Sequence, residues 1–143
     1  MKLVLFCTFA LVLVIQFNQS ESCKCVSLPP QGHYCQSAFG ARVLVTGKQT
    51  PQPGQLVYSV SVEQIYRAND AARKALENGK LYTNPSSASC GVDDMAVDRS
   101  YIITGNVANG KTSIYGCNFH VAYDDASEDI KRGFAGEYNC NSM

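Results

Sequence analysis

The chain has 143 residues with 12 basic and 12 acidic side chains, so its formal net charge at pH 7 is zero. Nucleic acids and anionic membrane surfaces select for clustered Lys and Arg side chains, and the sequence contains no such cluster. We therefore expect neither nucleic acid nor a membrane as a partner. The length suits a single domain with a modest hydrophobic core.

Residues 1–22 have the features of an export signal. Lys2 is a short basic start, and the apolar run Leu3 to Ile15 is too short to span a bilayer as a helix, which disfavours a retained membrane anchor. Ser20 and Ser22 are small residues at the two positions that a signal peptidase reads. We predict that residues 1–22 are removed, that the mature protein is secreted and extracellular, and that Cys23 then carries a free α-amino group.

The cysteine spacing indicates disulfides rather than a metal site. Of the seven cysteines, Cys7 lies in the predicted signal, which leaves six. Six cysteines in a small exported chain indicate three disulfides, because the compartment is oxidising and a small core benefits from cross-links. A structural zinc site would need a Cys-x2-Cys pair or nearby histidines, which Cys23-Lys24-Cys25 does not supply.

The pairing of these six cysteines is open at this point, since 15 connectivities are possible. Three cysteines lie early and three lie late in the mature chain, and early-to-late pairing would close loops on the order of 70 to 100 residues. Such disulfides would attach the amino terminus to the body of the domain. The six are Cys23, Cys25, Cys35, Cys90, Cys117 and Cys140.

The first half of the mature chain predicts an extended segment, a short helix and two strands. Pro29 and Pro30 fix their own backbone angles and keep the residues from Val26 onward extended. Farther along, β-branched and apolar residues give way to a stretch rich in proline and glycine, and then to a run that alternates apolar and polar residues. The predicted elements are a helix over 31–38, a strand over 42–46, a turn over 47–54 and a half-buried strand over 56–63.

The second half predicts a helix or loop, three short strands and a final helix. Residues 69–78 favour a short helix with Asp70 as its cap, although a solvated loop fits about as well. Asn109-Gly110 is a turn signal that predicts a hairpin between the last two strands. The predicted elements are strands over 80–83, 101–104 and 112–115, and a helix over 127–134.

These elements predict a mainly β fold. Five short strands with tight turns and helical pieces at both ends can close into a small Greek-key barrel of the OB type. That barrel is shared by proteins of many functions, so the fold does not decide what the protein does.

The sequence offers no convincing enzyme site. His33 and His120 are the only histidines, and neither follows a nucleophile pattern. The pairs Asp93-Asp94 and Asp124-Asp125 are typical of solvated charges or helix caps, and the spaced acids of a calcium loop are absent. We expect that the protein is not an enzyme and has no cofactor of its own.

The residues after the predicted cleavage site resemble a known family. The run Cys23-Lys24-Cys25-Val26-Ser27-Leu28-Pro29-Pro30-Gln31-Gly32-His33-Tyr34-Cys35 is similar to the opening of the tissue inhibitors of metalloproteinases. The similarity continues in Pro85-Ser86-Ser87-Ala88-Ser89-Cys90-Gly91-Val92, in Cys117-Asn118-Phe119 and at Cys140, and so covers the mature chain.

The resemblance implies an OB barrel of the netrin (NTR) type over residues 23–140, with a short tail over 141–143. It implies disulfides Cys23 to Cys90, Cys25 to Cys117 and Cys35 to Cys140. Because the chain stops three residues after Cys140, the family's second domain is expected to be missing.

The resemblance also implies a mechanism and a partner. The α-amino nitrogen and carbonyl oxygen of Cys23 would chelate the catalytic zinc of a metalloproteinase of the matrix type, so the zinc is shared with the target and the inhibitor is expected to be a monomer. The residues implied in protease binding are Cys23, Lys24, Cys25, Val26, Ser27, Ser87, Ala88 and Ser89.

The sequence departs from the family pattern at three places. Lys24 stands where the family has Thr or Ser, a side chain that enters the specificity pocket beside the zinc. Residues 69–78 look longer than the family's connector, and Tyr123 stands where Trp is common. Lys24 supports an alternative function, a secreted NTR-type binding module that does not inhibit.

Overall fold

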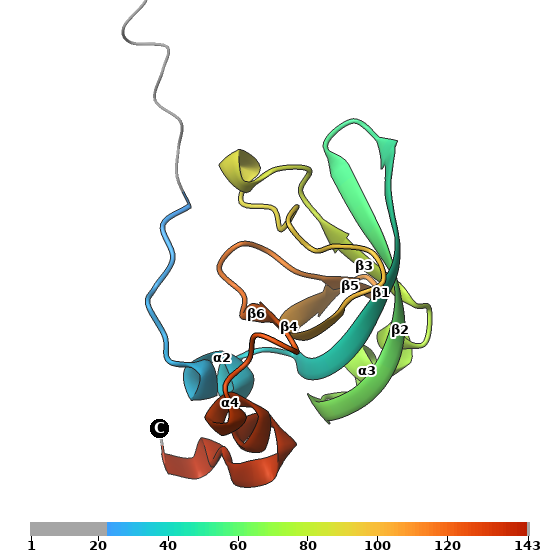
Figure 1. Ribbon diagram of the computed structural model, residues 1–143. Helices are drawn as coiled ribbons and strands as arrows, with labels where there is room; N and C mark the ends of the chain where they lie inside the picture. Colours follow the sequence, from blue (N-terminus) through green and yellow to red (C-terminus); the bar gives the residue numbers. More distant parts are fainter. Residues whose placement is uncertain (1–22, 143) are drawn as a thin grey trace, which may run out of the picture.

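The computed structural model describes residues 23–142, so the predicted signal segment and its cleavage site lie outside the described residues. The described chain is mainly β, with five strands in a closed barrel and short helices around it (Figure 1). The barrel strands are β1 (Phe39–Gln52), β2 (Gln55–Ala68), β3 (Lys80–Thr83), β4 (Ser100–Ala108) and β5 (Lys111–Ser113).

The barrel closes through β1. The strand order is β1-β2-β3-β5-β4, and β4 pairs again with β1, so that Phe39 lies opposite Ala68 on one side and Gly105 on the other. The β3–β5 pairing is parallel and the others are antiparallel. The predicted five-stranded barrel is therefore confirmed. The sequence did not predict β6 (His120–Ala122), which pairs with β4 and is too short to show a periodic pattern.

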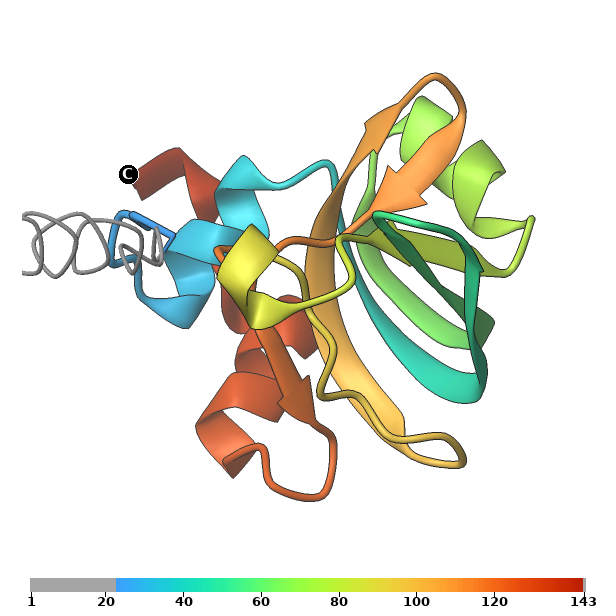
Figure 2. The same cartoon turned by 90° about the horizontal axis from the view of Figure 1, so that it is seen from above.

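Short helices lie at two places on the barrel. α2 (Pro30–Gln36) and α4 (Glu128–Arg132) lie near each other and near the carboxyl terminus, whereas α3 (Asp70–Leu76) lies away from them (Figures 1 and 2). The remaining helical turns are η1 (Ser87–Ser89), η2 (Gly133–Glu137) and η3 (Cys140–Ser142). Across residues 23–142, no helix is both long and apolar enough to cross a bilayer.

The predicted turn over residues 47–54 is wrong in extent. The β1–β2 ladder continues to the pair Gln52 and Gln55, and the chain reverses at Pro53-Gly54, where Gly54 has a φ of 81°. Pro51 is accommodated because the register shifts between Gln49 and Gln52, so this part of the strand does not need its backbone N–H.

The helix alternative for residues 69–78 is confirmed, but its cap is Asn69 rather than Asp70. The Asn69 side chain accepts a hydrogen bond of 2.8 Å from the Ala72 N–H. Ala72, Ala75 and Leu76 are buried. Their burial favours the helix over a solvated loop, since most helical stability comes from packing of an apolar face.

The last two predicted elements differ slightly in length from those observed. The β4–β5 hairpin turns at Asn109 and Gly110, both of which have positive φ, as a tight two-residue turn requires. β5 ends at Ser113 rather than at residue 115. The predicted helix over 127–134 is α4, capped by the Ser127 side chain, followed by η2.

The hydrophobic core has two parts. The larger fills the barrel and includes Phe39, Tyr58 and Ile103, each fully buried. The smaller part lies under α2, α4 and η2 and centres on Phe134, whose ring is 5.2 Å from that of Tyr34. This second cluster holds α2, and therefore the end of the amino-terminal segment, against the barrel.

Candidate functional site

The amino-terminal segment from Cys23 to Pro29 runs without regular secondary structure along the body of the domain (Figure 1). Lys24, Cys25, Val26 and Ser27 are all exposed, and the Val26 side chain is 77% exposed. The segment is therefore accessible to a partner over most of its length.

Disulfides hold this segment in place. The structure has bridges Cys23–Cys90, Cys25–Cys117 and Cys35–Cys140, which is the pairing implied by the family resemblance. Two of the three bridges fall within the first three residues of the described chain. Cys23 and Cys25, the two ends of the Cys-x-Cys sequence, are therefore fixed to the loops that carry Cys90 and Cys117.

The loop before Cys90 has a rigid conformation of its own. The Ser89 hydroxyl donates to the Ser86 carbonyl oxygen at 2.9 Å, and the Asn84 side chain donates to the Ser89 carbonyl oxygen at 2.5 Å. Gly91 packs against this loop so closely that a Cβ there would collide with the Asn84 carbonyl oxygen. These contacts leave Ser87 and the rest of η1 exposed on the outside of the turn.

The two segments meet at the Cys23–Cys90 bridge. The Cys23 sulfur is 3.7 Å from the Ser87 carbonyl oxygen, so the start of the segment lies against η1. We name the surface formed by Cys23–Ser27 and Ser87–Ser89 the binding ridge. The structure thus brings together the two groups of residues, 60 or more positions apart, that the resemblance implies in protease binding.

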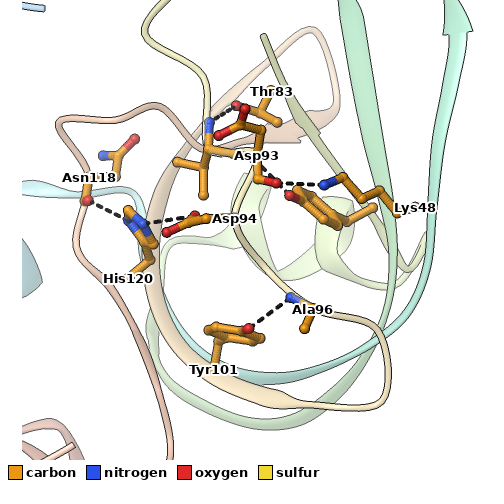
Figure 3. Close-up of polar contacts among 10 residues, drawn as sticks. Lys48, Thr83, Asp93, Asp94, Ala96, Tyr101, Asn118 and His120 are labelled. Carbon is orange, nitrogen blue, oxygen red and sulfur yellow. Dashed lines mark hydrogen bonds and ion pairs between the residues drawn. The ribbon is translucent and has the colours of Figure 1, made fainter. Parts of the chain in front are cut away.

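The loop that follows the ridge is anchored on the barrel by two strand side chains (Figure 3). The Tyr58 hydroxyl donates to the Val92 carbonyl oxygen, and the Val92 N–H donates to the Thr83 hydroxyl, both at 2.9 Å. Burial raises the pKa of Tyr58 to about 12, so its hydroxyl remains a donor well above neutral pH. Sequence reasoning missed this support. The signal available was Thr83, a polar residue on a strand face that otherwise carries core residues.

Two more contacts fix the rest of this loop (Figure 3). The Lys48 ammonium donates to the Asp93 carbonyl oxygen at 2.5 Å, and the Ala96 N–H donates to the Tyr101 hydroxyl at 2.8 Å. Residues 91–96 are therefore held by side chains from β1, β2, β3 and β4. The loop that follows the ridge is thus tied to four of the five barrel strands.

The two histidines and one acid of each pair, Asp94 and Asp125, have structural partners. His120 Nε2 lies 3.4 Å from an Asp94 carboxylate oxygen, and the His33 ring lies 6.2 Å from that of Phe119. Asp125 pairs with Arg99 at 2.9 Å. Within residues 23–142, no group of three or more His, Cys, Asp or Glu side chains is placed to hold a metal ion.

A shallow groove of about 410 Å³ runs beside the ridge. Its walls are residues 25–28 of the amino-terminal segment and residues 116–120 of the chain around Cys117, with His33 between them. The groove continues the exposed surface of the ridge toward β6.

Comparison with known proteins places these features in one family. The family model described as tissue inhibitor of metalloproteinase matches residues 21–142. The chain is 28% identical over 134 residues to a tissue inhibitor of metalloproteinase of Drosophila melanogaster, which covers 92% of this chain and 61% of the relative.

Vertebrate relatives are similar at the same level. Metalloproteinase inhibitor 3 of Scyliorhinus torazame is 29% identical over 127 residues, or 85% of this chain and 58% of the relative. Metalloproteinase inhibitor 2 of Homo sapiens is 26% identical over 136 residues, which cover 90% of this chain and 61% of the relative. The chain spans about three fifths of the length of these relatives. Its barrel, its three disulfides and the match over residues 21–142 agree, and the chain belongs to the tissue inhibitor of metalloproteinase family.

Proposed function

We propose that this chain is a secreted inhibitor of zinc metalloproteinases of the matrix type. It would act as a monomer through a domain over residues 23–140 that begins, after removal of residues 1–22, at Cys23. The observation that carries the proposal is the Cys23–Cys90 bridge, which fixes the expected first residue against the exposed turn η1. Membership of a family of inhibitors supports the same conclusion.

The chemistry of Cys23 limits which of its atoms can bind a metal. Its sulfur is bonded to Cys90 and so is not a thiolate ligand. The donors that remain are the α-amino nitrogen and the carbonyl oxygen of the same residue, which together can form a five-membered chelate. Bound to the zinc of a protease, these two atoms would replace the water that attacks the substrate. The zinc belongs to the target, and the inhibitor needs no cofactor of its own.

The rest of the ridge would contact the protease on both sides of its zinc. Lys24 would enter the specificity pocket, Cys25, Val26 and Ser27 would follow the cleft, and Ser87, Ala88 and Ser89 would lie on the other side. The two disulfides at Cys23 and Cys25 support this arrangement, because a segment that is already ordered loses less entropy on binding.

Inhibition by the chain that begins at Cys23 is expected to depend on pH. Only the neutral α-amine has a lone pair for zinc, and a chain-terminal amine has a pKa of about 8. Below that pH the neutral fraction falls, so we expect the inhibition constant to rise about tenfold per pH unit between about pH 7 and pH 5.

The measurement is the inhibition constant against a matrix-type catalytic domain, with the protease's own kinetic constants determined at each pH. The same protein with its Cys23 α-amine acetylated serves as the control. If the inhibition constant of the free-amine protein does not change over this pH range, the α-amine has no role in binding the zinc.

Replacing Lys24 with Thr is expected to strengthen inhibition. Lys24 is exposed in the free protein, and an ammonium that enters an apolar pocket without a partner is costly, even though its stem can pack along the wall. We expect Lys24→Thr to lower the inhibition constant about tenfold or more against proteases with an apolar pocket, and least where the pocket is acidic.

Lys74→Thr is the matched control, because Lys74 is an exposed lysine on α3, away from the ridge. The inhibition constants are measured against several metalloproteinases. If Lys24→Thr lowers none of them, the Lys24 ammonium carries no cost in the pocket. If neither the natural chain nor Lys24→Thr inhibits, the alternative of a non-inhibitory NTR-type binding module is favoured.

A further inference from the structure

A second cavity lies on the barrel away from the binding ridge. It has a volume of about 250 Å³ and lies where the end of α3 approaches β3 and the β4–β5 turn. Figure 1 shows α3 on the opposite side of the barrel from η1. The side chains and turn that shape it are Asn78, Lys80, Tyr82, Asn109, Gly110 and Lys111.

Strand alternation directs the important side chains into this cavity. Leu81 and Thr83 on β3 are buried in the barrel, so Lys80 and Tyr82, which alternate with them, lie on its outer face. Lys111 on the neighbouring strand β5 places its ammonium 5.1 Å from the centre of the Tyr82 ring. The cavity is thus lined by two lysines and one aromatic ring from adjacent strands.

Neither lysine has an acidic partner among residues 23–142. The Lys80 ammonium donates to the Ser59 hydroxyl at 2.8 Å, and neither Lys80 nor Lys111 forms an ion pair in the part of the chain that the structure describes. In contrast, Arg99 and Lys131 each pair with a carboxylate. Among the residues that the structure describes, the lining contains no Asp or Glu, so the two lysines give this cavity a positive charge.

The polar groups around the lysines suit an anion. Asn78 and Asn109 also line the cavity, and the amide of an Asn side chain is a hydrogen-bond donor. The carbonyl groups at the end of α3 would repel an anion, but those of Ala75 and Leu76 already accept hydrogen bonds from the N–H groups of Asn78 and Gly79.

We propose that this cavity binds a tetrahedral oxyanion, a sulfate or phosphate, either free or as an ester on a ring. The Lys80 and Lys111 ammonium groups donate charge-assisted hydrogen bonds to its oxygens. The Lys111 ammonium lies over the Tyr82 ring, so the ring of an ester packs against the edge of Tyr82. This site does not depend on the binding ridge or on inhibition.

The test is a titration of the oxidised, ¹⁵N-labelled protein with sodium sulfate, sodium phosphate and phenyl sulfate at constant ionic strength, followed by NMR. We expect the amide signals of Asn78, Gly110 and Lys111 to shift and saturate. Lys80→Gln and Lys111→Gln should each weaken binding about tenfold or more, since each removes a hydrogen bond to a charged group. Tighter binding of phenyl sulfate than of inorganic sulfate would assign the ligand as a ring-borne ester, and equal binding would assign the free anion.

Lys74→Gln is the matched control, because it removes a charge from α3 without altering the lining of the cavity. It should change the affinity by less than about twofold. Shifts that do not saturate, or equal weakening by Lys74→Gln, would overturn the site. Inhibition of a metalloproteinase by the cavity variants should be unchanged, so this proposal and the proposed function can fail separately.

Discussion

Addition of a single alanine before Cys23 is expected to abolish inhibition, raising the inhibition constant about a thousandfold or more, equivalent to about 4 kcal/mol. The extension converts the Cys23 nitrogen into an amide, which has no lone pair available for zinc. It also moves the free amine one residue, about 3.8 Å, away from the Cys23 carbonyl oxygen. The five-membered chelate can then no longer form.

The extended and natural proteins would be compared by inhibition constant against the same metalloproteinase, after mass spectrometry has verified the first residue of each. The matched control adds the alanine after Met143, far along the sequence from Cys23. Both proteins should have the same circular dichroism spectrum and three disulfides. Undiminished inhibition by the protein extended at Cys23 would exclude chelation by its α-amine.

Removal of the Cys23–Cys90 bridge is expected to weaken inhibition while leaving both chelating atoms in place. In Cys23→Ala/Cys90→Ala, residue 23 keeps its α-amine and carbonyl oxygen but loses its attachment to η1. Cys25–Cys117 still holds the next part of the segment. Residues 23 and 24 must then be ordered on binding, at about 1–2 kcal/mol of backbone entropy each, so the inhibition constant should rise about 30-fold to 1000-fold.

The matched control is Cys35→Ala/Cys140→Ala, which removes the bridge between α2 and η3. Each double variant should lose about 2–5 kcal/mol of free energy of unfolding, measured by denaturant titration. Only the first should lose affinity beyond its effect on folding, because the ridge contains Cys23 but neither Cys35 nor Cys140. Equal effects of the two variants on inhibition would show that the bridge at Cys23 contributes stability alone.

Local signals predicted the elements that depend on neighbouring residues. The strand over 80–83 has the predicted bounds, and Asn109-Gly110 forms the predicted hairpin turn. The residue pattern did not predict the extent of a strand where the neighbouring strand determines it. Residues 47–52 are rich in turn formers but extend β1, because β2 lies opposite them and a register shift accommodates Pro51. β6 forms because its backbone pairs with the free edge of β4.

By itself, the sequence determined the family, the fold class and the cysteines that would be paired, because the Cys23-Lys24-Cys25 motif, the motif around Cys90 and the order of the cysteines are specific and can be read without knowing which residues meet in space. Only the tertiary structure decided which loop supports the ridge and where Lys80 and Lys111 meet Tyr82. These contacts join residues from 9 to 34 positions apart, and such proximity follows from barrel closure and strand order rather than from any local preference of the chain.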